Sequence, residues 1–178
     1  MKQEIEQKKV NQIAKKLGLI LVNQGQSFIK NAFHIKPIEI LSGKIVEVLK
    51  SRGFNKNITL SDGRFYLIPF SQWKEIIEVD WTDKMKYVKE KRDCDNFAYS
   101  FSSRMSELFE INSAGIVWGY IYNKDTGKSI GGHLWNCIIT SDFKMYFYEP
   151  MKDTYLEYNS GKIVMGKWRY EALSFRFF

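Results

Sequence analysis

The stretch Lys91–Leu108, KRDCDNFAYSFSSRMSEL, predicts the helix around which the rest of the chain is organised. Its apolar residues recur at Phe97, Phe101 and Met105, which is helical spacing rather than the alternation of a strand. Cys94 lies at or just before the first turn. Because that turn presents unpaired backbone N–H groups and a partial positive charge, it is a favourable place for a nucleophilic thiolate and an oxyanion. We therefore treat Cys94 as a candidate nucleophile.

A structural explanation of the same cysteine stands beside this one. Free cysteine is among the most buried residue types and usually packs as a small apolar side chain. The chain has two cysteines, Cys94 and Cys137, far apart in the sequence. Two free thiols are the simpler interpretation, although a bridge between them remains open, and the pattern is not a disulfide framework of the small secreted kind.

Length and composition indicate a folded protein with one main domain. The chain has 178 residues, 44% of them hydrophobic and 16% aromatic, with three prolines. Such a composition can bury a core and is not typical of a disordered chain. We expect a basic, mainly helical segment over residues 1–60 and a second domain over residues 61–178.

The net charge of +7 is concentrated in the first third of the chain. Residues 1–60 hold 11 Lys and Arg against four Asp and Glu, whereas residues 61–178 hold 16 of each. This asymmetry favours an anionic partner for the N-terminal segment, such as nucleic acid, a cell-wall polymer or an acidic protein surface. A solvated, lysine-rich helix face is the commoner explanation of such a run.

The N-terminus and the apolar runs argue against membrane insertion. MKQEIEQKKVNQIAKK is too charged to contain the apolar region of a signal peptide. No run reaches the roughly 18 apolar residues that a transmembrane helix requires. We expect a soluble, most simply cytoplasmic protein without a signal peptide, and the sequence indicates no oligomeric state.

Beyond Asn112 the pattern changes from helical spacing to alternation. The predicted strands are AGIVWGYIY, HLWNCIIT, KMYFYE, IVM and WRYEALSFRFF. Short connections between them favour antiparallel pairing. Upstream, we expect short helices after Pro37, after an N-cap at Ser71 and after an N-cap at Thr82. The fold class is therefore α+β, with the Cys94 helix packed against an antiparallel sheet of about five strands.

Strand geometry predicts a histidine and a glutamate near each other. A nucleophilic cysteine needs a base, and the base needs a group that orients it. If HLWNCIIT and KMYFYE form a hairpin closed by Thr140 and Lys144, then His133 and Glu149 project from the same face. They are diagonal neighbours in that register, close enough for the carboxylate to reach the imidazole. A register shift of one residue would move Glu149 to the other face.

Two other residues compete for the orienting role. Asn136 follows His133 by three residues on the same strand, so we expect it to face away from the imidazole. Asp153, just past Pro150, is the alternative if Glu149 is displaced. We prefer Glu149.

The order Cys, His, acidic resembles the papain-like and transglutaminase-like cysteine peptidase superfamily. The resemblance is carried by CDNFA at a helix start, GHLWN at a strand start and the EP pair that ends the next strand. Within the superfamily it is nearest to the catalytic C-terminal domain of fungal agglutinins and to bacterial transglutaminase-like cysteine peptidases. It spans about Phe65 to the C-terminus and leaves the first 60 residues unexplained.

The resemblance implies a thiol protease with a papain-like core. Cys94 would attack a peptide or amide carbonyl and form a thioacyl-enzyme intermediate, His133 would act as base and then acid, and Glu149 would complete the catalytic triad. Papain has a glutamine shortly before its cysteine, and Val88 stands six residues before Cys94 here. Gln72 is therefore only a candidate for the oxyanion donor.

The resemblance also bears on cofactors and on the substrate groove. The agglutinin relatives depend on calcium, so the family implies calcium even though the sequence requires no cofactor and shows no EF-hand spacing. Asp93 and Asp95 could contribute oxygen ligands, but helix capping is the more ordinary role, and no metal site is predicted. Trp118 and Trp135 are groove candidates, with core packing as the alternative for both.

Three functions follow from these observations. The first is a cysteine peptidase-like hydrolase acting on a peptide or protein substrate. The second is acyl transfer of the transglutaminase type, in which an amine replaces water. The third is a non-catalytic binding module on the same scaffold, docked through the basic N-terminal segment.

Overall fold

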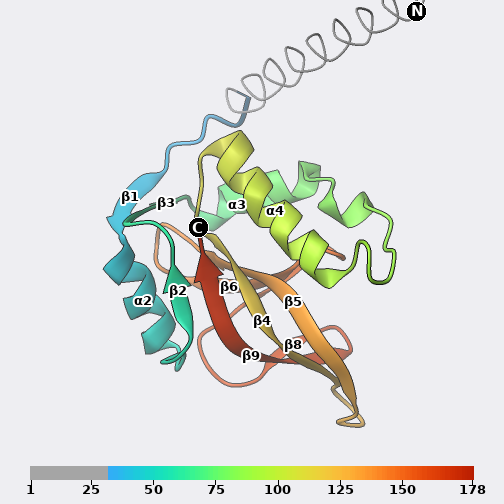
Figure 1. Cartoon of the computed structure of the whole chain (residues 1–178). Helices are drawn as coiled ribbons and strands as arrows, with labels where there is room; N and C mark the ends of the chain where they lie inside the picture. Colours follow the sequence, from blue (N-terminus) through green and yellow to red (C-terminus); the bar gives the residue numbers. More distant parts are fainter. Residues whose placement is uncertain (1–31) are drawn as a thin grey trace, which may run out of the picture. The chain divides into compact units, whose positions relative to one another are not determined.

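The computed structural model describes residues 32–178 (Figure 1). A compact unit spans Lys36–Phe178, and all the elements described below belong to it. This unit includes residues 36–60, which the charge pattern groups with the basic N-terminal segment. The first 31 residues of the basic, mainly helical segment expected over residues 1–60 lie outside the described residues, and so does their part in its proposed docking role.

Helices and strands both contribute to the compact unit. Its helices are α2 (Ser42–Ser51), α3 (Phe70–Val79), the 3-10 helix η1 (Thr82–Lys84) and α4 (Cys94–Phe109). Its strands are β1 (Ile38–Leu41), β2 (Ile58–Leu60), β3 (Arg64–Leu67), β4 (Ala114–Asn123), β5 (Ser129–Ile139), β6 (Met145–Glu149), β7 (Thr154–Glu157), β8 (Ile163–Met165) and β9 (Trp168–Phe177). The α+β class predicted from the sequence is confirmed.

The main sheet has seven strands instead of the predicted five. Its order is β2-β9-β4-β5-β6-β7, and β8 pairs with the N-terminal part of β9. All neighbours are antiparallel except β2 and β9, which are parallel. The two strands that the sequence pattern missed, β2 and β7, are three and four residues long. Segments this short contain too few alternations to be recognised.

The two faces of the sheet are covered by different helices. On one face, α2 contributes Ile45, Val48 and Leu49 to a core that includes Trp135, Phe147 and Phe175. On the other face, α4 packs across the start of β4 and the end of β5. There Ser102 donates a hydrogen bond to the backbone oxygen of Ala114. Figure 1 shows α3 beside α4. The end of β4 and the start of β5, which are joined by the β4–β5 turn, extend beyond α4 (Figure 1).

One predicted helix boundary is wrong, and one predicted helix forms only a single 3-10 turn. Helix α3 begins at Phe70 with Pro69 as its N-cap, rather than at Ser71. After Thr82 only η1 forms, because DKMKYVKEK has charged residues on all sides and no apolar stripe to bury. The loop that follows is closed by a 2.7 Å hydrogen bond from the Arg92 N–H to the Val88 oxygen.

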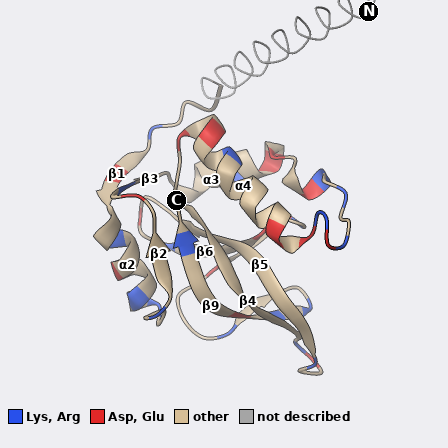
Figure 2. Ribbon diagram, viewed as in Figure 1, with Lys and Arg blue, Asp and Glu red and all other residues tan. Residues whose placement is uncertain are grey.

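Charged residues are distributed unevenly over these elements. Strand β4 carries no Asp, Glu, Lys or Arg, and neither does β5. Figure 2 shows these strands in tan, with charges mainly on the helices and connecting loops. Within residues 32–178, no helix combines the length and apolar character needed to span a membrane.

Candidate functional site

Cys94 is the first residue of α4, as the sequence predicts. Asp93 is the N-cap residue, and its backbone N–H donates to the side-chain oxygen of Asn96 at 3.2 Å. This contact fixes the start of the helix. The Cys94 side chain is partly exposed and forms no disulfide.

The hairpin register predicted for β5 and β6 is confirmed. Asn136 pairs with Tyr148 and Ile139 with Met145, and the Thr140 N–H donates to the Lys144 oxygen at 3.0 Å. Strand β6 ends at Glu149, so β5 continues beyond its partner toward His133. His133 therefore lies where the β5 edge is no longer paired with β6.

His133 and Glu149 form a buried pair. The distance from His133 Nε2 to Glu149 Oε2 is 2.7 Å, and the two residues are 8% and 4% exposed. Glu149 also accepts hydrogen bonds from the Tyr170 hydroxyl at 3.1 Å and from the Met151 N–H at 3.4 Å. Sequence reasoning missed Tyr170, because its place beside the carboxylate depends on how β9 pairs with β4.

The imidazole of His133 also forms a side-chain hydrogen bond with Cys94. Burial lowers the pKa of His133, but the hydrogen bonds to Cys94 and Glu149 and the charge of Glu149 outweigh it and raise the pKa to about 9. The imidazole is therefore protonated at neutral pH. Three residues that are distant in the sequence form one hydrogen-bonded line from sulfur to carboxylate.

The two alternative orienting residues have other partners. Asn136 faces away from His133, as predicted, and its Nδ2 donates to the oxygens of Ala98 and Gly115. Asp153 accepts a hydrogen bond of 2.6 Å from the Tyr148 hydroxyl. Neither side chain contacts the imidazole in the described part of the chain.

The remaining predicted residues have different environments. Trp135 is fully buried in the core and Trp118 is 42% exposed, so these two groove candidates differ. Gln72 lies on α3, and its Oε1 is buried without a hydrogen-bond partner. Among residues 32–178, the structure records no hydrogen bond between Gln72 and Cys94.

Asp93 and Asp95 interact with each other at the start of α4. The hydrogen bond between the two side chains is the main cause that lowers the pKa of Asp93 and raises that of Asp95. Among the residues described, no three His, Cys, Asp or Glu side chains form a group that could hold a metal ion. Calcium binding remains a prediction from the family resemblance.

Strand β4 presents a row of aromatic side chains, of which Trp118 and Tyr120 are exposed and Tyr122 is half-buried, and which the sequence indicates only in part. Trp118, Tyr120 and Tyr122 alternate along β4 on one face, and we call them the aromatic strip. Trp118 and Tyr120 are 42% and 38% exposed, with ring centroids 5.6 Å apart. Gly132, opposite Tyr120 on β5, has no side chain to cover them. The alternation in AGIVWGYIY is the signal that could have identified this row.

The hydrogen-bonded line from Cys94 to Glu149 is compatible with two chemical roles. A thiol, an imidazole and a carboxylate in this order can transfer a proton between sulfur and nitrogen. The same contacts also satisfy polar groups that would be costly to bury alone and hold the start of α4 against β5. The fold and this line define a mixed α+β protein with a partly exposed thiol beside a buried imidazolium.

Comparison with solved structures shows which proteins share this fold. The structure described as "PSL1a-E64 complex" aligns with a TM-score of 0.54 and 21% identity over 78% of this chain and 51% of that chain. Polyporus squamosus lectin bound to the human-type influenza-binding epitope Neu5Aca2-6Galb1-4GlcNAc aligns with a TM-score of 0.52 and 20% identity over 78% and 49%. The chain thus spans about half the length of these structures. No family model and no curated protein matches the sequence.

These structures contradict the expected assignment to the cysteine peptidase superfamily. One of the two similar structures is described as a lectin, and neither description names a peptidase. The predictions of a hydrolase, a thiol protease and a catalytic triad acting on peptide substrates are therefore wrong on this comparison. The physical reason is that a Cys–His–Glu line also serves as a satisfied polar network and does not by itself define a reaction. The α+β class of the predicted papain-like core is shown, and its papain-like arrangement is not.

Proposed function

We propose that this chain is a non-catalytic binding module that recognises a saccharide through the aromatic strip. The observation that carries the proposal is the exposure of Trp118 and Tyr120 on a sheet face left bare by Gly132. Two exposed aromatic rings in contact with each other are unusual on a protein surface that has no partner. They offer flat apolar area with little side-chain entropy to lose on binding.

The chemistry of a sugar ring suits this surface. A pyranose presents a face of C–H groups that can pack on an aromatic ring, and a rim of hydroxyls that can form hydrogen bonds. The Tyr122 hydroxyl donates to Glu171 Oε2 at 2.8 Å, so polar groups border the strip. The likeness of the fold to Polyporus squamosus lectin, whose bound epitope is a saccharide, also supports this ligand class.

We further propose that Cys94, His133 and Glu149 position the binding surface and do not themselves react. Leu134, the neighbour of His133, lies opposite Trp118 in the register of β4 and β5. The contact of Cys94 with His133 holds the start of α4 near this part of β5. On this proposal, the contacts of Cys94, His133 and Glu149 hold β5 in place, and β5 supports the neighbouring strand β4 that carries the aromatic strip.

Replacing Trp118 with alanine is expected to weaken saccharide binding about tenfold, because the ring supplies much of the apolar contact area. Binding of the full chain would be measured by titration calorimetry with neutral and sialylated oligosaccharides, including Neu5Aca2-6Galb1-4GlcNAc. Tyr155→Ala is the matched control, since Tyr155 is 43% exposed but lies on β7. The proposal fails if the unaltered chain binds none of these saccharides, or if the two variants lose affinity equally.

Cys94→Ser is expected to leave saccharide affinity within about twofold of the unaltered chain, because serine keeps a hydrogen-bonding group of similar size beside His133. The same titration measures this. A loss of the protein's biological role in Cys94→Ser, with binding and folding intact, would show that the sulfur reacts and would contradict a purely binding function.

A further inference from the structure

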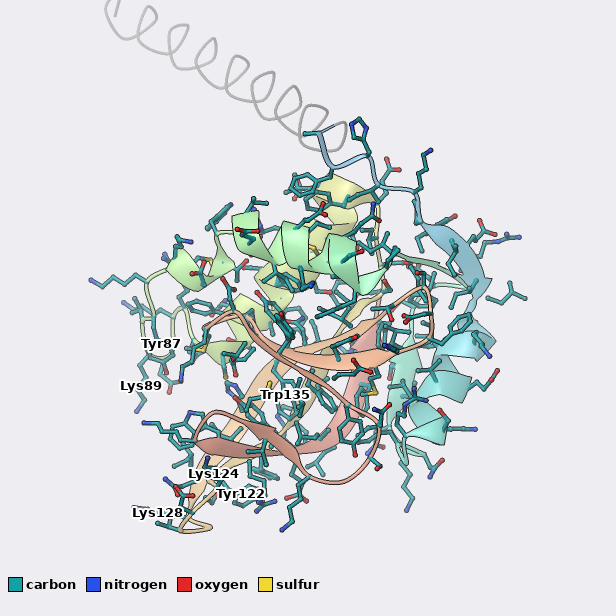
Figure 3. All side chains as sticks on the ribbon, turned by 180° about the vertical axis from the view of Figure 1, so that it is seen from behind. Tyr87, Lys89, Tyr122, Lys124, Lys128 and Trp135 are labelled. Carbon is teal, nitrogen blue, oxygen red and sulfur yellow. The ribbon has the colours of Figure 1, made fainter. Side chains whose placement is uncertain are left out.

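The outer end of the main sheet gathers positive charge beside the aromatic strip. Lys124 and Lys128 lie on the turn that joins β4 to β5, and Figure 3 shows both near Tyr122 at the end of this hairpin. Lys167 lies between β8 and β9, and Arg169 is the second residue of β9. We call Lys124, Lys128, Lys167 and Arg169 the basic end.

Backbone contacts and strand pairing bring these four residues together. Tyr122 pairs with Arg169 in the register of β4 and β9. The Lys124 N–H donates to the Lys167 oxygen at 3.1 Å, which joins the hairpin to the β8–β9 turn. The cationic side chains therefore lie on two hairpins that are attached to each other.

Arg169 links the basic end to the aromatic strip. Its guanidinium carbon lies 4.1 Å from the centroid of the Tyr122 ring. Arg169 also lines a cavity of about 230 Å³ together with Lys162, Tyr170 and Glu171. Two cations thus line one small cavity, whose other walls include Phe54, Tyr158 and Ile163.

The cations of the basic end are not neutralised within the described part of the chain. The ion pairs recorded there involve Lys44, Arg64, Lys84, Arg104, His133 and Lys144, and none of the basic end. Glu171 and Asp125 lie near and offset part of the charge. The four cations of the basic end and Lys162 nevertheless outnumber these two carboxylates, so an anion is attracted to this end.

We propose that the saccharide bound by the aromatic strip is acidic, with its carboxylates or sulfates on the basic end. This inference rests on the proposed function and adds the charge of the ligand. The sugar rings would pack along Trp118 and Tyr120, and the next acidic groups would reach Arg169, which lies over the Tyr122 ring, and the hairpin lysines. A polysaccharide with a charge on successive residues fits both parts of this continuous surface.

The experiment measures the affinity of the full chain for four probes: heparin, polygalacturonate, neutral dextran and single-stranded DNA of similar length. Affinity is measured at 50 mM and 200 mM salt by fluorescence anisotropy or calorimetry. We expect binding to at least one acidic polysaccharide that exceeds binding to dextran about tenfold and weakens with salt, because added salt screens exposed charges.

The variant Lys124→Gln/Lys128→Gln is expected to lower affinity for the acidic polysaccharide about tenfold and to flatten its salt dependence. The control Lys50→Gln/Lys56→Gln removes the same charge from exposed positions near α2 and should change neither. Trp118→Ala separates the two proposals, because it should weaken neutral and acidic saccharides alike.

Each outcome distinguishes the proposals. Binding to neutral saccharides through Trp118, without preference for acidic ones, overturns the acidic ligand and leaves the binding function intact. Absence of binding to every saccharide overturns both. DNA bound more tightly than either acidic polysaccharide overturns the inference in favour of a nucleic-acid surface.

Discussion

Gly119→Ala is expected to destabilise the protein by about 3 kcal/mol, near the upper end of the cost of overpacking. A β carbon at position 119 would overlap the carbonyl oxygen of Glu171 and lie 2.9 Å from its carbonyl carbon. It would also lie 3.0 Å from Cη2 of Trp135, which is fully buried. The obstacle is mainly the backbone of β9, which cannot rotate away as a side chain can. Urea unfolding followed by circular dichroism measures the change.

Gly132→Ala is the matched control on the neighbouring strand. The nearest atom to a β carbon there is Trp118 Nε1 at 3.9 Å, an ordinary contact distance. We expect this variant to unfold within about 1 kcal/mol of the unaltered chain, the usual cost of a substitution outside the core. Equal destabilisation by both alanines would show that β4 and β9 do not approach as closely as described.

The free energy of unfolding is expected to fall by about 3 kcal/mol as the pH rises from 6 to 9.5, through loss of the His133 proton. The folded state raises the pKa of His133 from 6.5 to about 9. A raised pKa stabilises the folded state fully below 6.5, and this contribution disappears as the pH passes through 9. Urea titrations at pH 6 and pH 9.5 measure the difference.

His133→Gln removes the titrating group and is expected to abolish most of this pH dependence. Glu149→Gln keeps the imidazole but removes the charge that stabilises its protonated form, so the pH dependence should shrink. Both variants will be less stable at pH 6, because a buried polar partner loses its counterpart. A pH dependence that is unchanged in His133→Gln would show that another group is responsible.

The aromatic strip and the basic end make the binding proposals testable on one surface. Trp118 and Tyr120 provide the apolar contact, and Arg169 joins them to the hairpin lysines through Tyr122. Substitutions at either end should affect different classes of saccharide. The Trp118 variant therefore measures what the aromatic strip contributes to affinity, and the Lys124 and Lys128 double variant measures what the basic end contributes.

Local patterns in the sequence were sufficient for several elements. The 3.6-residue spacing after Cys94 predicts α4, and the alternation in HLWNCIIT and KMYFYE predicts β5 and β6. The turn between Thr140 and Lys144 sets their register, so His133 and Glu149 were predicted on one face and lie 2.7 Å apart. These features depend on residues close in the chain.

The exposure and the contacts of other residues depend on packing between distant segments, which no local sequence pattern indicates. Trp118 and Trp135 looked equivalent as groove candidates, yet one is exposed and the other lies in the core. Tyr170 reaches Glu149 only because β9 pairs with β4. The short strand β2 became part of the sheet through parallel pairing with β9, although the charge pattern assigned it to a separate segment.

The amino-acid sequence by itself determined the α+β class, the helix that begins at Cys94 and the hairpin that carries His133 and Glu149, because these follow from the periodicity of single elements and from one short turn. Only the tertiary structure decided which aromatic residues are exposed and where positive charge collects. Residues 61–178 hold equal numbers of acidic and basic residues, and it is the attachment of the β4–β5 hairpin to the β8–β9 turn that brings the cations together. Pairing between distant strands follows from the free energy of the whole packed sheet, which no single stretch of sequence contains.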